Sequence, residues 1–258
     1  KTKRKIAALL VVHTFGNAVD ILNLIKICRE KNIKIIEDAA ESLGSYYKNK
    51  NQKNHLGSIG DIGCISFNGN KIMTSGGGGA ILTNNVKYYE IAKHLSSQSK
   101  SDQVYFKHDQ LGYNYRINNL QSAIGLAQIE KINMFLKQKK IIYNKYKEFF
   151  TKIDGLNIML NPPYSISNNW INILKISNKK INQEKIFNIF NKNKIQTRSV
   201  WLPNHKHPYL NKYQTYHIEN AFKLFKSSIC LPSSANLKKQ DLYRVMEIIL
   251  NIKNLYDR

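Results

Sequence analysis

The N-terminal part of the chain alternates between apolar runs and an amphipathic stretch. Ile6 to Val12 is a continuous apolar run, which suits a strand buried on both faces. Asp20 to Asn32 has its apolar residues at helical spacing, and Ile33 to Ile36 is a second apolar run that ends at Glu37 and Asp38. Strand, helix and strand in this order predict a βαβ unit with parallel strands. Because ligands gather at the carboxyl ends of such strands, Asp38 is expected near a site.

The same patterns predict the rest of the first half. The expected elements are strands at Gly63–Phe67 and Gly79–Thr83, a helix at Val86–Ser97, and a long helix from the N-cap Asn118 to about Phe150. The polar stretch Ser45–Ser58 predicts an exposed excursion, and Ser99–His108 predicts a mobile loop.

The composition changes near Gly155, and prolines with a Ser/Asn cluster then mark a connection that runs to Asn169. We therefore expect a larger domain at residues 1–150, which includes the long helix, and a smaller α/β domain at residues 151–258. The elements predicted in the smaller domain are strands at Trp170–Ile176 and Ile195–Arg198 and helices at Asn182–Asn193, Ile218–Lys226 and Lys239–Lys253.

Charge and cysteine content narrow the class of protein. The net charge of +23 comes from 34 Lys against 6 Arg, scattered along the chain, whereas nucleic-acid sites concentrate Arg among aromatic residues. We therefore favour a drift of the sequence toward lysine on the solvated surface as the origin of the charge. A basic nucleic-acid-binding protein stays an alternative.

The absence of a long apolar run argues against a membrane span. Cys28, Cys64 and Cys230 lack metal-site spacing, so we expect no metal, reduced thiols and a cytoplasmic protein.

One turn carries residues suited to covalent chemistry. Lys71 lies between two predicted strands and just before the glycines Gly76–Gly79, which permit close approach to the backbone. An amine there can bind an aldehyde, Asp38 can hold a ring nitrogen, and Ser66 and Asn114 can hold a phosphate, as a pyridoxal phosphate enzyme requires. Taken singly, each has a plain structural reading, and the glycines do not match the nucleotide-binding loop patterns.

A joint pattern of short blocks runs over nearly the whole chain: Val12–Gly16, Ile36–Gly44, Gly60–Phe67, Lys71 with its glycines, Gly112–Arg116, Gln121–Glu130, Trp201–Pro203 and Leu231–Ser234. This pattern resembles the DegT/StrS-type sugar aminotransferases, fold-type-I pyridoxal phosphate enzymes that act on nucleotide-linked keto sugars. The run Ser66–Lys71 with its glycines resembles, more narrowly, the 4-aminotransferase branch of legionaminic acid and bacillosamine synthesis.

The resemblance implies a fold and roles for named residues. The fold would be a three-layer α/β large domain with a mostly parallel sheet and a smaller C-terminal α/β domain. Lys71 would form the Schiff base with pyridoxal 5'-phosphate and carry protons. Asp38 would pair with the pyridine nitrogen, Glu41 would lie beside the ring, and Ser66 would bind the phosphate. Asn114 would reach the phosphate of the neighbouring subunit's cofactor, so the active unit would be a homodimer.

The implied reaction transfers an amino group, with L-glutamate as the expected donor, to C4 of a UDP-linked 4-keto-6-deoxy N-acetylhexosamine, for bacterial surface glycan or nonulosonic acid synthesis. Another nucleotide keto sugar, 3-amino or GDP-linked, stays open. His13 and Trp201 are candidate substrate residues, and a structural hydrogen bond suits His13 equally well. Family members extend well before the position of Lys1, so we expect a truncated large domain without its N-terminal phosphate loop. An inactive fragment is a further alternative.

Overall fold

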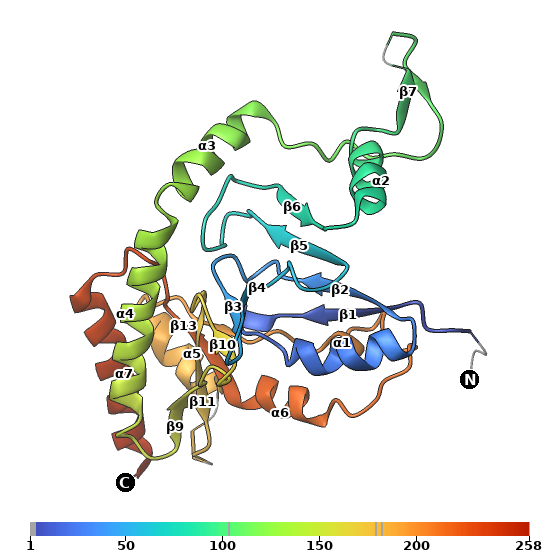
Figure 1. Cartoon of the computed structure of the whole chain (residues 1–258). Helices are drawn as coiled ribbons and strands as arrows, with labels where there is room; N and C mark the ends of the chain where they lie inside the picture. Colours follow the sequence, from blue (N-terminus) through green and yellow to red (C-terminus); the bar gives the residue numbers. More distant parts are fainter. Residues whose placement is uncertain (1–3, 103, 179, 182, 258) are drawn as a thin grey trace. The chain divides into compact units, whose positions relative to one another are not determined.

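The computed structural model describes residues 4–102, 104–178, 180–181 and 183–257 (Figure 1). Contacts divide the chain into two compact units. Unit 1 is Lys1–Lys137 with Asn161–Trp170, and unit 2 is Gln138–Leu160 with Ile171–Arg258. Unit 2 thus begins before the boundary expected after residue 150, and Asn161–Trp170, which lies beyond that boundary, is grouped with unit 1.

The main sheet of unit 1 has the strand order β1-β2-β5-β6 (Figure 1). Its strands are β1 (Ala8–Val12), β2 (Lys34–Asp38), β5 (Ile62–Ser66) and β6 (Gly79–Leu82). β1, β2 and β5 are parallel, and α1 (Ile21–Glu30) connects the first two, so the predicted βαβ unit is confirmed. β6 is antiparallel to β5 because the chain turns back through a single loop, which makes the sheet mixed.

One face of this sheet packs against α1. Val11, Glu37 and Gly63 share that face, because Val11 pairs with Glu37 and Glu37 pairs with Gly63 across the ladder. The strands and α1 form one core cluster, in which the most buried members include Ile21 and Ile35. We call this side the covered face.

The opposite face carries apolar and polar side chains that remain accessible. Leu10 is 60% exposed, Val12 46% and Ile81 55%, although all three lie on strands. Asp38 and Cys64 pair with each other across β2 and β5 on this side and are half-buried. We call it the open face.

The stretch expected to be an exposed excursion is ordered instead. β3 (Tyr46–Lys48) and β4 (Lys53–His55) form a hairpin, and β10 (Ser165–Ile166) pairs with β3. The prediction was wrong because it weighed polarity alone, whereas Tyr47 and Leu56 point into the core.

Other short elements complete this part of unit 1. The 3-10 turn η1 (Thr14–Gly16) follows β1, and α2 (Val86–Ser96) follows β6 as predicted. β7 (Lys100–Asp102) and β8 (Lys107–His108) form a small hairpin where a loop was expected.

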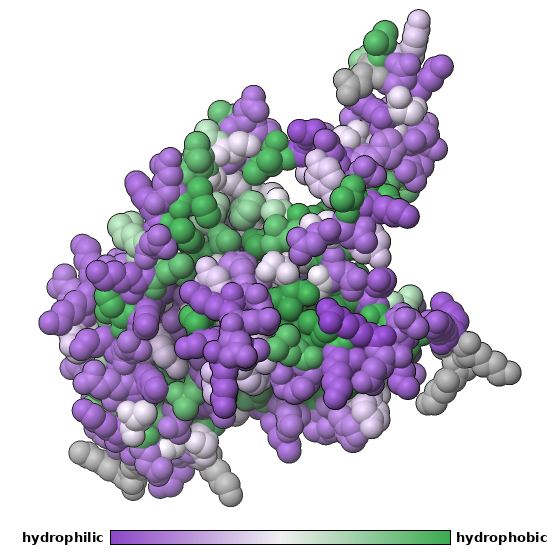
Figure 2. All heavy atoms as spheres, viewed as in Figure 1, coloured by the Kyte–Doolittle hydropathy of each residue, from purple (hydrophilic) through white to green (hydrophobic). Residues whose placement is uncertain are grey.

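The predicted long helix is two helices. Asn118 is the N-cap, as expected, and forms a capping box with Gln121 at the start of α3 (Asn119–Ile129). α4 (Ile132–Phe150) follows after a break at Glu130 and Lys131. All eleven residues of α3 are described and none is buried. Figure 2 shows hydrophobic side chains gathered along α3 on the visible face, and the exposed members are Leu120, Ile124, Leu126 and Ile129.

Unit 2 is an α/β lobe with an antiparallel sheet of order β12-β13-β11-β9. The strands are β9 (Leu156–Ile158), β11 (Asn172–Ile176), β12 (Arg198–Ser199) and β13 (Ser228–Leu231). The helices are α5 (Gln183–Lys192), α6 (Glu219–Ser227), α7 (Lys239–Asp257) and the short η2 (Asn204–Lys206). The predicted start at Asn182 lies outside the described residues. The hydrophobic core of unit 2 includes Tyr146, Phe150, Leu174, Ile229 and Met246.

In the described part of the chain, none of the helices combines the length and apolar composition needed to cross a bilayer.

Candidate active site

Lys71 lies on the loop between β5 and β6, and backbone hydrogen bonds hold that loop closed. The N–H of Phe67 donates to the carbonyl of Gly78 at 3.0 Å, and the N–H of Ser75 donates to the carbonyl of Phe67 at 3.0 Å. Inside the loop, the N–H of Lys71 donates to the carbonyl of Asn68 at 3.0 Å. The lysine is therefore carried by a fixed turn at the carboxyl end of β5.

The side chain of Lys71 is enclosed on two sides. Its Nζ lies 3.9 Å from Oε1 of Glu41 and 4.3 Å from the ring centre of Trp170. The side chain of Lys71 is 13% exposed and that of Glu41 is 12% exposed. The amine thus has a negative partner and an aromatic partner, and part of its surface stays accessible.

Two carboxylates follow each other at the end of β2. Asp38 is the last residue of that strand, and its Oδ1 accepts the N–H of Ala40 at 3.1 Å. Glu41 is in the turn that follows, where its Oε2 accepts the N–H of Phe15 at 2.5 Å. This backbone contact leaves Oε1 of Glu41 directed at Lys71.

Asp38, Cys64 and Ser66 share the open face at the carboxyl ends of their strands, because Asp38 pairs with Cys64 and side chains alternate along β5. Burial raises the pKa of the Cys64 thiol, and the charge of Asp38 raises it further, as expected for neighbouring groups. The hydroxyl of Ser66 accepts the N–H of Asn68 at 3.2 Å. A carboxylate and a hydroxyl therefore lie on one face, beside the loop that carries Lys71.

His13 occupies a different environment. Its Nε2 lies 2.9 Å from Oε2 of Glu37, and its Nδ1 accepts the N–H of Val19 at 3.3 Å. These partners assign the ring proton to Nε2. His13 and Glu37 are both fully buried, so the ring makes the structural hydrogen bond considered for His13, and its role at a substrate stays a prediction.

Glu37 is the centre of this buried group. Besides His13, it accepts the N–H groups of Gly57, Ile59 and Gly60 at 2.8, 2.7 and 2.6 Å. Burial alone would raise the pKa of Glu37, but the hydrogen bonds from His13 and the backbone outweigh it and hold that pKa below its ordinary value. Glu37 therefore shapes the turn before β5.

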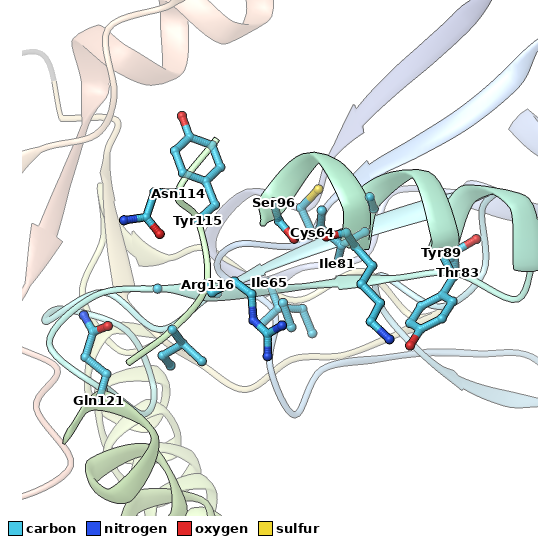
Figure 3. A pocket seen from close by; sticks show the side chains of 16 residues that line it. Cys64, Ile65, Ile81, Thr83, Tyr89, Ser96, Asn114, Tyr115, Arg116 and Gln121 are labelled. Carbon is cyan, nitrogen blue, oxygen red and sulfur yellow. Dashed lines mark hydrogen bonds between the residues drawn. The ribbon is translucent and has the colours of Figure 1, made fainter. Parts of the chain in front are cut away.

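Asn114 lies on an exposed segment that forms a β-bridge with Ser97. It lines a groove of about 800 Å³ together with Cys64, Arg116 and Gln121, and the side chains of this group stand around the groove in Figure 3. Cys64 brings this groove to the open face, next to Asp38, whereas Lys71 and Glu41 are not part of its lining.

Trp201 belongs to unit 2 and is 43% exposed. Its role at a substrate stays a prediction.

Two residues near Lys71 were missed by the sequence analysis. Trp170 is 2% exposed and contacts Lys71, and Asn168 is 2% exposed and hydrogen-bonds the backbone of Glu41. Asn168 falls in the Ser/Asn cluster that was interpreted as a connection, and Trp170 was predicted to begin the strand that follows it. The available signal was a large aromatic residue directly after a polar connection, since a Trp side chain is highly buried on average.

Comparison with known proteins gives the family. The model of the DegT/DnrJ/EryC1/StrS aminotransferase family matches residues 1–250. The chain belongs to this family. The resemblance of its sequence blocks is confirmed at that level.

Two relatives show how similar the sequence of this chain is to those of other family members. The EpsN protein of Bacillus subtilis (strain 168), named as a pyridoxal phosphate-dependent aminotransferase, is 32% identical over 95% of the chain. The GDP-perosamine synthase of Escherichia coli O157:H7 is 32% identical over 96% of it. The chain spans 63% and 66% of the lengths of these two proteins.

A solved structure confirms the predicted fold class. The DegT/DnrJ/EryC1/StrS aminotransferase from Brucella abortus superposes with a TM-score of 0.85 at 21% identity, over 95% of this chain and 64% of that one.

The donor set around Lys71 fits the cofactor that sequence analysis predicts. An amine, the carboxylates Asp38 and Glu41, and the hydroxyl of Ser66 provide a nucleophile, anions for a ring nitrogen and a donor for a phosphate. The loop backbone at Gly69 and Gly76 faces open space, because a Cβ built on either residue would meet no atom within 4 Å. Among the described residues, no three His, Cys, Asp or Glu side chains gather as a metal ion would require.

Proposed function

We propose that this chain carries the reaction centre of a pyridoxal phosphate-dependent aminotransferase acting on nucleotide-linked keto sugars. One observation supports it above the others: the Lys71 amine lies 3.9 Å from Glu41, in the turn directly after Asp38. An enclosed lysine amine at the carboxyl ends of parallel strands, with carboxylates nearby, suits covalent binding of an aldehyde cofactor.

The roles follow from the positions of the side chains. Pyridoxal phosphate, when bound, supplies an electron sink for amino-group transfer. Lys71 would hold the cofactor through its aldehyde carbon, and its amine would serve as general acid and base. Asp38, on the open face, holds the proton of the ring nitrogen, and Glu41 orients the amine of Lys71. Ser66 donates its hydroxyl to the phosphate.

For the substrates, we propose L-glutamate as amino donor and a UDP-linked 4-keto-6-deoxy N-acetylhexosamine as acceptor, aminated at C4. The run Ser66–Lys71 with its glycines supports this choice through its resemblance to the legionaminic acid and bacillosamine branch. A GDP-linked keto sugar is the second candidate, favoured by the 32% identity to a GDP-perosamine synthase.

The covalent step is tested on protein expressed from its complete reading frame. Pyridoxal phosphate is added, the bound form is fixed with borohydride, and the labelled peptide is identified by mass spectrometry. The expected result is one pyridoxyl group on Lys71, which Lys71→Ala abolishes and Lys26→Ala, an exposed lysine of α1, leaves unchanged. A label that survives Lys71→Ala contradicts the proposal.

The substrate assignment is tested with keto sugars that differ only in nucleotide. UDP-, GDP- and dTDP-linked 4-keto sugars are each supplied with L-glutamate, and the amino sugar product is measured by mass spectrometry and NMR. The UDP-linked sugar is expected to react fastest, with nitrogen at C4. Faster turnover of the GDP-linked sugar would favour the second candidate, and amination at C3 would contradict the assigned position.

We also propose that the active unit is a homodimer in which Asn114 serves the partner's site. The exposed apolar residues of α3 and the exposed position of Asn114 support this. Co-expression of Lys71→Ala with Asn114→Ala tests it. If Asn114 acts on its partner, mixed dimers hold one intact site, and roughly a quarter of the wild-type activity returns. Activity no higher than that of either single variant would contradict it.

A further inference from the structure

A short segment returns to unit 1 and lies against the loop of Lys71. Asn161–Trp170 is grouped with unit 1, although the chain on both sides of it belongs to unit 2. The hydroxyl of Ser165 accepts the N–H of Ala18 at 2.9 Å. The N–H of Asn168 donates to the hydroxyl of Ser45 at 2.9 Å. These bonds fasten the segment to elements more than a hundred residues earlier in the chain.

Asn168 connects this segment to the turn of Glu41. Its Nδ2 donates to the carbonyls of Glu41 and Leu43, both at 2.9 Å. Its Oδ1 accepts the N–H of Trp170 at 3.0 Å. One buried amide therefore fixes the backbone of Glu41 and the backbone of Trp170 together.

Trp170 contacts the reactive loop at two points. Its ring nitrogen donates to the carbonyl of Asn70 at 2.6 Å, and its ring lies 4.3 Å below Nζ of Lys71. The indole N–H is a donor only, so the bond to Asn70 sets the orientation of the ring plane. A cation within about 6 Å of a Trp ring is attracted by its π-electrons.

We propose that Trp170 is a positioning residue for Lys71. Its ring and the carboxylate of Glu41 form the resting site of the free amine, which holds the flexible lysine beside the place where it meets the aldehyde. The inference rests on the proposed function, since the resting state matters only if Lys71 is released and recaptured. A purely structural Trp170 would fill space without contacting the charged end of Lys71.

The test measures the free amine and needs no turnover. Acetic anhydride at low dose acylates accessible neutral amines, and the rate at Lys71 is read against that at Lys26 in the same sample by peptide mass spectrometry. Trp170→Leu removes the ring that covers and attracts the amine, so the Lys71 to Lys26 ratio is expected to rise by about tenfold. Trp170→Phe keeps an aromatic face, and its ratio is expected to stay within about threefold. An unchanged ratio in Trp170→Leu overturns the proposal.

A second measurement covers the case in which Trp170→Leu does not fold. The emission of Trp170 is obtained as the difference between the spectra of the wild type and Trp170→Phe. Lys71→Met removes the charge above the ring and is expected to change the intensity and maximum of this component, whereas Lys26→Met is expected to leave it unchanged. An identical Trp170 component with Lys71→Met contradicts the proposal.

Failure of this inference can be told apart from failure of the proposed function. If borohydride fixes no pyridoxyl group on Lys71 of the wild type, the function is wrong. If the label forms normally but acylation and emission do not respond to these variants, only the role of Trp170 is wrong.

Discussion

Two adjacent residues of β2 face opposite sides of one sheet and have opposite environments. Glu37, on the covered face, is fully buried and accepts hydrogen bonds from His13 and three backbone amides. Asp38, on the open face, is half-buried and accepts one short-range backbone bond, from Ala40. A carboxylate whose acceptor positions are all filled by protein donors stabilises the fold, whereas one with acceptor positions left over can also bind a ligand. The covered face thus builds the scaffold, and the open face and its carboxyl edge carry the side chains that we propose for catalysis.

The largest expected effect comes from breaking the buried group of the covered face. Glu37→Gln removes the charge that His13 and the amides of Gly57, Ile59 and Gly60 surround. Loss of one partner of a buried, paired network costs about 3–5 kcal/mol, so the free energy of unfolding should fall by that order in urea titrations. Asp38→Asn keeps an acceptor for Ala40 and should change it by no more than about 0.5 kcal/mol. An equal fall in the free energy of unfolding for Glu37→Gln and Asp38→Asn would contradict the difference between the covered face and the open face.

The second effect concerns backbone packing behind Glu37. A Cβ built on Gly63 would lie 1.8 Å from the carbonyl oxygen of Gly57, so Gly63→Ala must displace backbone on the covered face. We expect a loss of about 3 kcal/mol in the free energy of unfolding. Gly69→Ala, on the open loop with no atom within 4 Å, is the matched control and should cost less than about 0.5 kcal/mol. A stable Gly63→Ala variant would mean that the strand can shift without penalty.

The pH dependence of stability should follow Glu37. Its pKa is lower in the folded chain than the ordinary 4.5, so its contribution is present above that value and is lost as the pH falls through the folded pKa. The free energy of unfolding of the wild type should therefore decline on acidification below 4.5 more steeply than that of Glu37→Gln. Urea titrations across this range measure both slopes, and parallel curves would contradict the account.

The smallest expected effect probes the open face. Burial and the neighbouring charge of Asp38 raise the pKa of the Cys64 thiol. Asp38→Asn removes the charge, so alkylation of Cys64 by iodoacetamide should accelerate about two- to threefold at fixed pH. Peptide mass spectrometry follows Cys64 against the buried Cys230 as internal reference. Asp61→Asn, whose residue pairs with Lys34, is the control variant. An unchanged alkylation rate of Cys64 in Asp38→Asn would mean that the two side chains are too far apart to interact.

Local patterns predicted the βαβ unit well. Continuous apolar runs and helical spacing mark β1, α1 and β2 directly, and Asp38 closes β2 as expected. The N-cap at Asn118 was also readable, because a side-chain cap acts within one turn. The break at Glu130 and Lys131 was not, since neither Pro nor Gly marks it. β13 was missed although all four of its residues are buried, because a short apolar run does not reveal its partners.

Some residues of the candidate site could be predicted from local sequence patterns, and others could not. Lys71, Asp38 and Ser66 were predicted from residue type and position relative to the strands, and the structure places them at one edge of one sheet. Trp170 reaches Lys71 across about a hundred residues of chain, and no periodic pattern encodes such a contact. The same holds for Asn168 and the turn of Glu41.

We propose that Lys71 and Asp38 hold one pyridine ring between them. The most direct test is ¹⁵N NMR of protein loaded with pyridoxal phosphate labelled at the ring nitrogen, with attachment to Lys71 verified by borohydride fixation in each sample. We expect a protonated ring nitrogen in the wild type and an unprotonated one in Asp38→Asn, with Lys71 labelled in both. An identical nitrogen resonance in the two proteins would contradict it.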